Sequence, residues 1–396
     1  MNAFETLLTL PEADQQARGI RYTPHEIAQQ PAMWRKTCDM LGEQRDQIAA
    51  FLTEAGLQGT TQATGLLCGA GSSEYIGTAV SFGLRTHLQR PMISVATTDF
   101  ISQPRAWLLP NHDYTVISFA RSGNSPESVA TYNLVKQIAP HSKQIIITCN
   151  RKGELAHAAA RDDQTLCLVL PEETHDRSLV MTSSFSTMAL TALGLGLLDQ
   201  PQALRSLVYK AGEAADRVLR VYADDLKAFV AQPIARVCYL GSNALFGTME
   251  EARLKMLEMT EGRVAANVNT FLGLRHGPQV FVNADCLVVA AFASDPYVRQ
   301  YEMDLLRELH RKGQGAGTLI ICDRATDEIR QLASLCIELY PDGEAIGDAY
   351  RVLTDVVVGQ VLATFKCLAV GLKPDNPSES GTISRVVQGV TIYPFS

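Results

Sequence analysis

The stretches GLLCGAGSS (65–73) and YTVISFARSGNSPES (114–128) decide the fold of this chain. Each opens with a continuous apolar run, which is typical of a strand covered on both faces of a sheet. Each then passes through a turn of glycine and serine into a helical pattern. Strands that alternate with helices in this way predict an α/β fold with a parallel, doubly wound sheet. The predicted strands of this first sheet are Gly65–Cys68, Met92–Ala96, Tyr114–Phe119, Gln144–Thr148 and Thr165–Leu170.

The same pattern returns in the second half of the chain. Gly71 corresponds to Gly241 at a shift of 170 residues and Ser122 to Ser294 at a shift of 172. Landmarks at nearly one offset favour two copies of one α/β unit, with chance similarity between two such units as the alternative. We expect four regions: an N-terminal helical segment (1–58), a first unit (59–230), a second unit (231–370) and a C-terminal arm (371–396).

Composition argues against several classes of protein. The 396 residues carry a net charge of −7 and no sustained run of Lys or Arg, so neither nucleic acid nor a membrane surface is an expected partner. The nine cysteines form no CxxC pair and the eight histidines no HxH or HExxH pair, so we expect no metal and reduced thiols in a cytoplasmic protein. The first twenty residues lack the basic start of a signal peptide. The most apolar run, 356–372, is interrupted by Gln360 and Lys366, so we expect no membrane span.

Two hydroxyl-rich turns follow neighbouring predicted strands. Glycines let the backbone approach an anion closely, and serines add hydroxyl donors. Because backbone N–H groups and the positive ends of helices favour phosphate, the pair of turns predicts a monophosphate site without a metal or an organic cofactor. An ordinary turn between a strand and a helix is the alternative for either turn alone. The predicted phosphate- and sugar-binding residues are Ser72, Ser73, Ser122, Asn124 and Ser125, with Ser183 and Ser184 from a further helix start.

These turns lack the GxGxxG pattern of dinucleotide sites and the GK[ST] of a P-loop. The corresponding turns of the second copy are LGSNA and ASDPY. There Asp295 would place a carboxylate where a phosphate would lie. We therefore expect only the first copy to bind phosphate.

At these turns the chain resembles the sugar isomerase (SIS) domain family, whose members bind phosphosugars on flavodoxin-like sheets. EEARLKMLE (250–258) and GLRHGP (273–278) are similar to two signatures of the isomerase half of glucosamine-6-phosphate synthase. The galactosamine-6-phosphate deaminase branch, also called tagatose-6-phosphate ketose/aldose isomerase, is resembled by ARSGNSPES (120–128), ETHDRSLVMTSS (173–184) and SGTISRVVQGVTIYP (380–394).

The resemblance implies two tandem SIS units and roles for individual residues. The serines named above would hold phosphate or sugar hydroxyls, Glu258 would move a proton between C1 and C2, and His276 of a neighbouring subunit would open the sugar ring. Arg121 stands where the family has a neutral amide and would add a charged clamp. Gln388 stands where the synthase-like pattern has a lysine, so we expect no lysine imine. No amidotransferase half precedes the SIS region, which favours the direction of deamination.

The expected chemistry needs one base and one proton shuttle. A partly desolvated carboxylate can carry the C2 proton to C1. Glu251 projects from the predicted helix in a direction similar to Glu258. From the residues alone, Glu258 is more simply interpreted as an exposed charge paired with Lys255. A histidine can pass a proton between O1 and O5, but His276 is equally well interpreted as a solvated loop residue.

We therefore expect a deaminase/isomerase that turns D-galactosamine 6-phosphate into D-tagatose 6-phosphate and ammonia by ring opening, proton transfer and hydrolysis of a ketimine. His175 and Asp176 would contact the C2 amine or the C4 hydroxyl, or form only a capped turn. Arg385 would be a lid residue or a surface charge. The alternatives are a plain aldose/ketose isomerase, a deglycase of another amino-sugar phosphate, and a non-catalytic sugar-phosphate sensor. We expect a homodimer or homotetramer with a shared active site, in which a carboxylate of the second half acts on a sugar whose phosphate the first half holds.

Overall fold

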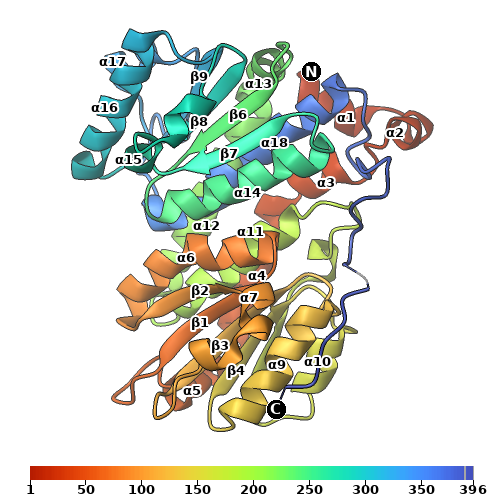
Figure 1. The fold of residues 1–396 in the computed structure, drawn as a ribbon, viewed down its shortest axis with the longest axis vertical. Coiled ribbons are helices and arrows are strands. Elements are labelled where there is room, and N and C mark those ends of the chain that lie inside the picture. Colours follow the sequence, from red (N-terminus) through yellow and green to blue (C-terminus); the bar gives the residue numbers. More distant parts are fainter. Residues whose placement is uncertain (388, 396) are drawn as a thin grey trace. The chain divides into compact units, whose positions relative to one another are not determined.

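The computed structural model describes residues 1–387 and 389–395, so Gln388 lies outside the described residues. The chain divides into two compact units, each built around its own sheet (Figure 1). The first-sheet unit comprises Ala32–Asp176, Ser183–Val208 and Ser384–Ser396. The second-sheet unit comprises Met1–Pro31, Arg177–Thr182 and Tyr209–Ile383. Each unit therefore combines segments that are distant in sequence.

The first sheet is parallel throughout, with its strands in the order β2-β1-β3-β4-β5. All of the strands predicted for this sheet are present, and no bound differs by more than one residue. This order, with the chain starting in the interior of the sheet and moving outward in both directions, confirms the doubly wound prediction. The strands are β1 (Thr64–Gly69), β2 (Met92–Ala96), β3 (Tyr114–Ala120), β4 (Lys143–Thr148) and β5 (Thr165–Val169).

Helices cover both faces of this sheet because successive residues of a strand point to opposite sides. Leu66 of β1 packs with Phe100 of α7 and Val135 of α9 in one buried cluster. On the other face, Gly77 of α6 lies against Leu67. The helices are α4 (Gln30–Glu43), α5 (Arg45–Glu54), α6 (Ser72–Leu88), α7 (Thr97–Ser102), α8 (Pro104–Trp107), α9 (Pro126–Ile138), α10 (Glu154–Ala159), the 3-10 turn η1 (Glu172–Thr174) and α11 (Ser183–Leu195).

The second sheet is also parallel, with its strands in the order β7-β6-β8-β9-β10. This order matches the first sheet strand for strand, which confirms the predicted fold class. The strands are β6 (Arg236–Leu240), β7 (Ala265–Asn269), β8 (Cys286–Ala291), β9 (Gly317–Cys322) and β10 (Leu335–Glu338).

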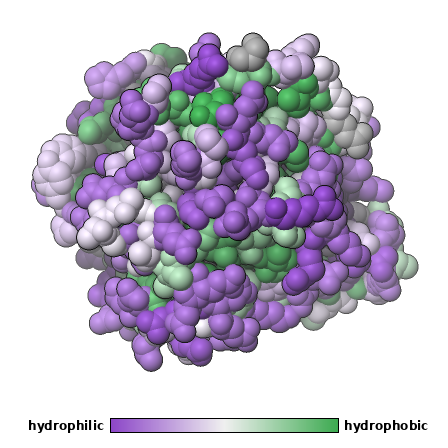
Figure 2. Space-filling model, turned by 90° about the horizontal axis from the view of Figure 1, so that it is seen from below, coloured by the Kyte–Doolittle hydropathy of each residue, from purple (hydrophilic) through white to green (hydrophobic). Residues whose placement is uncertain are grey.

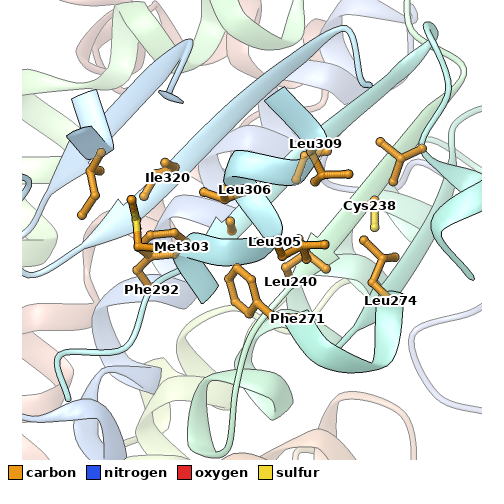
Figure 3. Packing of buried hydrophobic residues seen from close by; sticks show 14 of the residues in the cluster. Cys238, Leu240, Phe271, Leu274, Phe292, Met303, Leu305, Leu306, Leu309 and Ile320 are labelled. Carbon is orange, nitrogen blue, oxygen red and sulfur yellow. The ribbon is translucent and has the colours of Figure 1, made fainter. Parts of the chain in front are cut away.

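The helices of the second-sheet unit come from both ends of the chain. They are α1 (Ala3–Thr9), α2 (Glu12–Arg18), α3 (Thr23–Ala28), α13 (Ala223–Val230), α14 (Ala244–Met259), α15 (Phe271–Leu274), α16 (Pro296–Lys312), α17 (Asp327–Leu332) and α18 (Val352–Ala369), with 3-10 turns η2 (Pro278–Phe281) and η3 (Asp348–Tyr350). The long α12 (Pro201–Val221) contributes residues to both units. On one face of the sheet, Leu305, Leu306 and Leu309 of α16 pack with Cys238 and Ile320 of the strands (Figure 3).

The strand ends of the two sheets correspond at a shift of 172 residues. A Cβ on Gly69 would lie 2.4 Å from the backbone oxygen of Ser73, and a Cβ on Gly241 would lie 2.6 Å from that of Leu245. Two residues further on, Gly71 has a φ of 57° and Asn243 a φ of 52°. Gly241 therefore corresponds to Gly69, so the pairing of Gly71 with Gly241 predicted from the sequence is wrong.

Helix α18 is long and apolar enough, by length and composition alone, to cross a membrane, but 89% of its most apolar window is buried inside the structure. The two residues that interrupt its apolar run are both satisfied. Gln30 Nε2 donates to Gln360 Oε1 over 2.8 Å, and Lys366 Nζ donates to the carbonyl of Gln232 over 3.0 Å. The helix is thus a core helix of its unit. On the face of the molecule shown in Figure 2, hydrophilic residues predominate, with hydrophobic residues in small groups between them.

We predict that Gly359→Ala destabilises the protein by about 1–2 kcal/mol. Alanine gains up to about 1 kcal/mol of helix propensity over glycine, but a Cβ at this position of α18 would lie 2.6 Å from Cβ of Ala252 on α14, and overpacking costs about 1–3 kcal/mol. Gly42→Ala is the control, since among the described residues nothing lies within 4 Å of a Cβ there. Urea unfolding should show a loss for Gly359→Ala and no loss for Gly42→Ala; equal stability of the two would contradict the prediction.

Candidate active site

The two hydroxyl-rich turns lie side by side at one edge of the first sheet. Strands β1 and β3 are hydrogen-bonded neighbours, so their carboxyl ends meet at the same edge. Ser72 and Ser73 begin α6 at the end of β1, and Ser122 follows β3. All three serines are nearly buried. The sequence prediction that the turns meet is therefore confirmed.

The second turn is fixed to the neighbouring segment that follows β4. Asn150 Nδ2 donates to the carbonyl of Ser122 over 2.7 Å, and Asn124 Oδ1 accepts from the N–H of Glu154 over 2.9 Å. Asn124 is exposed and Ser125 half-buried. The amide oxygen of Asn124 therefore caps α10, which leaves its Nδ2 as the group that can donate to a ligand.

The C-terminal arm binds the same edge through two arginines. The Arg121 guanidinium donates to the carbonyl of Arg385, and Arg385 Nε donates to the carbonyl of Asp176 over 2.9 Å. The end of the arm is held by Phe395, whose ring lies 5.2 Å from the guanidinium carbon of Arg105. Arg385 is half-buried and bonded within the unit, so it is not an ordinary surface charge.

Asp176 organises the start of α11. Its Oδ1 accepts from the hydroxyl of Ser183 over 2.8 Å, and its Oδ2 accepts from the N–H and the hydroxyl of Ser184 over 2.9 and 2.6 Å. All three residues are fully buried. Because a hydroxyl has one proton, both serines spend theirs on Asp176, so neither can donate to a phosphate in this arrangement. The geometry corresponds to the capped-turn interpretation of Asp176.

We predict that Asp176→Asn destabilises the protein by about 2 kcal/mol. The amide would replace one carboxylate oxygen with a donor that faces buried donors, and charged hydrogen bonds of this kind contribute about 1.5–3 kcal/mol. Asp163→Asn is the control because Asp163 is exposed in the same unit. Chemical unfolding measures the difference, and equal midpoints for the two variants would count against this role.

His175 lies beside the two arginines. Burial, followed by the charges of Arg385 and Arg121, lowers the pKa of His175 below its usual value. Its imidazole is therefore neutral near pH 7. Its Nε2 is buried and has no hydrogen-bond partner among residues 1–387 and 389–395.

The second-sheet unit carries the predicted base in a cluster of charges on α14. Lys255 Nζ lies 2.6 Å from Glu258 Oε2 and 3.1 Å from Glu251 Oε1. The side chains of Lys255 and Glu251 are fully buried, whereas that of Glu258 is 22% exposed. Burial lowers the pKa of Lys255, but the charges of Glu251 and Glu258 outweigh it and raise the net pKa. Lys255 thus anchors Glu258 with one oxygen facing outward, a role that sequence reasoning missed although the spacing of three residues indicates the pair.

His276 is exposed in the loop after α15. The loop is fixed at Arg275, whose Nε donates to Glu308 Oε2 over 2.8 Å. Gly277 follows with a φ of 118°, a conformation that favours glycine and ends the helix. The imidazole is therefore accessible to a ligand or to another subunit.

In the part of the chain that the structure describes, no group of three or more His, Cys, Asp or Glu residues is placed to hold a metal ion.

Two like sheets, of which the first carries a hydroxyl-rich edge and the second a buried Glu-Lys-Glu cluster, define a protein of the two-SIS phosphosugar class. No known family model matches the chain. It is 36% identical over 380 residues to D-galactosamine-6-phosphate deaminase AgaS of Shewanella sp. (strain ANA-3), covering 95% of this chain and 93% of the relative. It is 37% identical over 378 residues to the AgaS protein of Escherichia coli, covering 94% and 96%. The chain belongs to the AgaS family of D-galactosamine-6-phosphate deaminases.

A solved structure agrees with this assignment. The tagatose-6-phosphate ketose/aldose isomerase of Escherichia coli has a TM-score of 0.85 and 32% sequence identity to this chain, covering 94% of this chain and 97% of that one. The resemblance inferred from the motifs is thereby confirmed.

Proposed function

We propose that this protein converts D-galactosamine 6-phosphate into D-tagatose 6-phosphate and ammonia. The observation that carries the proposal is the anchored carboxylate of Glu258, held by buried Lys255 within the motif EEARLKMLE. Such a carboxylate is fixed in position and partly exposed, as a base that moves one proton between adjacent carbons must be. Membership of the AgaS family supports the choice of substrate.

In this proposal the edge of the first sheet holds the phosphate. Ser72, Ser73, Ser122 and Ser125 offer hydroxyl and backbone donors at two helix starts, and Arg121 adds a positive charge. Ser183 and Ser184 contribute indirectly, because their protons are spent on Asp176. The regions proposed from the sequence keep these tasks apart, with phosphate binding in 59–230 and proton transfer in 231–370.

The reaction follows from these groups. His276 moves a proton from O1 to O5 and opens the ring. Glu258 removes the C2 proton and returns it to C1, which leaves a ketimine at C2. Water adds to the C2=N bond, the C–N bond breaks, and ammonia leaves; the oxygen of that water becomes the carbonyl oxygen of the ketose. No metal or organic cofactor is required for any of these steps.

Discrimination between an amine and a hydroxyl at C2 is assigned to His175. A neutral imidazole nitrogen accepts a hydrogen bond from an ammonium group, and Nε2 is buried and unsatisfied in the described residues. Arg385 of the arm is proposed to cover the bound sugar.

The test is ammonia release from a panel of hexosamine 6-phosphates. We expect galactosamine 6-phosphate to be the best substrate, with tagatose 6-phosphate formed in equal amount. Ammonia release from another amino sugar alone would support the deglycase alternative, and aldose–ketose exchange without ammonia the isomerase. Binding of every sugar phosphate without turnover would support a sensor.

We also propose a cytoplasmic homo-oligomer whose active site takes His276 from a neighbouring subunit. Mixing an inactive Glu258→Gln variant with an inactive His276→Asn variant tests this. Mixed assemblies should regain part of the activity, because some sites then combine two intact residues. Failure to regain activity in demonstrably mixed assemblies would show that each subunit uses its own histidine.

A further inference from the structure

The turn after β8 corresponds to the phosphate turn of the first sheet. Ser294 lies 172 residues after Ser122, the same shift that relates the strand ends. In the first unit this turn is proposed to hold a substrate phosphate. In the second unit, the N–H of Ser294 donates to both carboxylate oxygens of Asp348, over 2.8 and 2.9 Å. A carboxylate of the chain itself thus lies at the position equivalent to the phosphate.

The surroundings of this carboxylate form a built anion site. Arg351 is fully buried, and its Nη1 lies 3.4 Å from Asp348 Oδ1. The same guanidinium bonds Asp355 and the carbonyls of Phe292 and Ile321 at the ends of β8 and β9. The hydroxyl oxygen of Ser294 is buried without a partner among the described residues, so its proton is available to an anion.

The carboxylate at this turn is not the one predicted from the sequence. Asp295 was expected there, but it caps α16 instead by accepting from the N–H of Tyr297 over 2.7 Å. Asp348 reaches the turn from the 3-10 segment η3, 54 residues further along the chain.

We propose that the β8–α16 turn is an anion-binding site that the chain fills with its own Asp348 carboxylate, and that inorganic phosphate or a phosphate monoester binds there when this carboxylate is removed. A tethered carboxylate is present at a high effective concentration and therefore excludes an external anion. The side chain of Asp348 is 24% exposed, so its removal opens the site to solvent. The second unit would then bind no substrate in the native protein, which limits the chain to one phosphosugar.

The other turn of this unit supports the assignment. At the shift of 172, Ser72 and Ser73 correspond to Ala244 and Leu245, which carry no hydroxyl. The second unit thus retains one anion turn out of two, and that turn is occupied internally. This inference concerns binding in the second unit and goes beyond the proposed catalytic function.

The experiment measures the thermal stability of Asp348→Ala with inorganic phosphate, against sodium chloride at equal ionic strength. Without phosphate, we expect this variant to melt several degrees below the wild type. Phosphate should raise its Tm by several degrees more than that of the wild type, whose own response comes from the first unit. Asp295→Ala removes a neighbouring carboxylate and is the matched control, with a phosphate response equal to that of the wild type.

Equal phosphate responses of Asp348→Ala and the wild type would overturn the proposal, as would an Asp348→Ala variant that is as stable as the wild type without phosphate. If that variant does not fold, Asp348→Asn carries the test. It keeps the shape and one acceptor but not the charge, so phosphate should still raise its Tm more than that of the wild type. No step measures turnover, so the result is independent of the proposed function.

Discussion

Replacing Glu258 with Gln should lower kcat for ammonia release by about 10³-fold, within the range that a positioned general base contributes. Glutamine has nearly the same size as glutamate and keeps an oxygen that can accept from Lys255. It cannot take a proton from C2, however, so the step from the open-chain imine to the ketimine stops. The phosphate-binding edge belongs to the other unit and carries none of these atoms. Binding of a hexitol phosphate should therefore change by less than about 3-fold.

Solvent exchange separates loss of the base from loss of structure. In D₂O, the native enzyme should incorporate deuterium at C1 of the product, because the base exchanges its proton with solvent during transfer. Glu258→Gln should incorporate none. Glu250→Gln is the control on the same helix and should behave as the native enzyme. Full turnover of Glu258→Gln would refute the assigned base.

The first sheet was predictable because each of its strands is apolar on both faces and bounded by glycine, proline or serine. The second sheet contains a strand that breaks this rule. Strand β7 has the sequence AANVN and lies at the edge of the sheet, where Asn267 and Asn269 are half-buried. Its polar pattern carries no strand signal. It forms because it pairs with β6, which is a tertiary effect.

The candidate site divides in the same way. The serine turns were predictable because adjacent parallel strands bring their carboxyl ends together, a consequence of topology alone. The roles of Asp176 and Asp348 were not, because both depend on long-range or loop geometry that no periodicity encodes. Asp176 was expected to contact the sugar, whereas its carboxylate bonds Ser183 and Ser184. Lys255 was visible as a neighbour of Glu258, but helical spacing does not reveal that it is fully buried.

That burial makes Lys255 the position where a single substitution should cost most in stability. We expect Lys255→Met to destabilise the protein by about 3–5 kcal/mol, since removing one partner of a buried ion pair leaves the other charge uncompensated. Glu251 is fully buried and would lose the cation 3.1 Å away. Because the pKa of Lys255 is raised in the folded protein, its contribution is fully present at neutral pH. The contribution is lost only above the ordinary lysine pKa of 10.5, as the pH rises through the higher folded value.

A second substitution distinguishes the charge from the packing of the lysine chain. Glu251→Gln combined with Lys255→Met removes the buried charge that the single variant leaves behind, so at least half of the lost stability should return, as shown by urea unfolding midpoints. Activity should not return with it, because Glu258 still lacks the ammonium group 2.6 Å from its Oε2. Recovery of both stability and kcat in the double variant would mean that Lys255 only neutralises Glu251 and does not position Glu258.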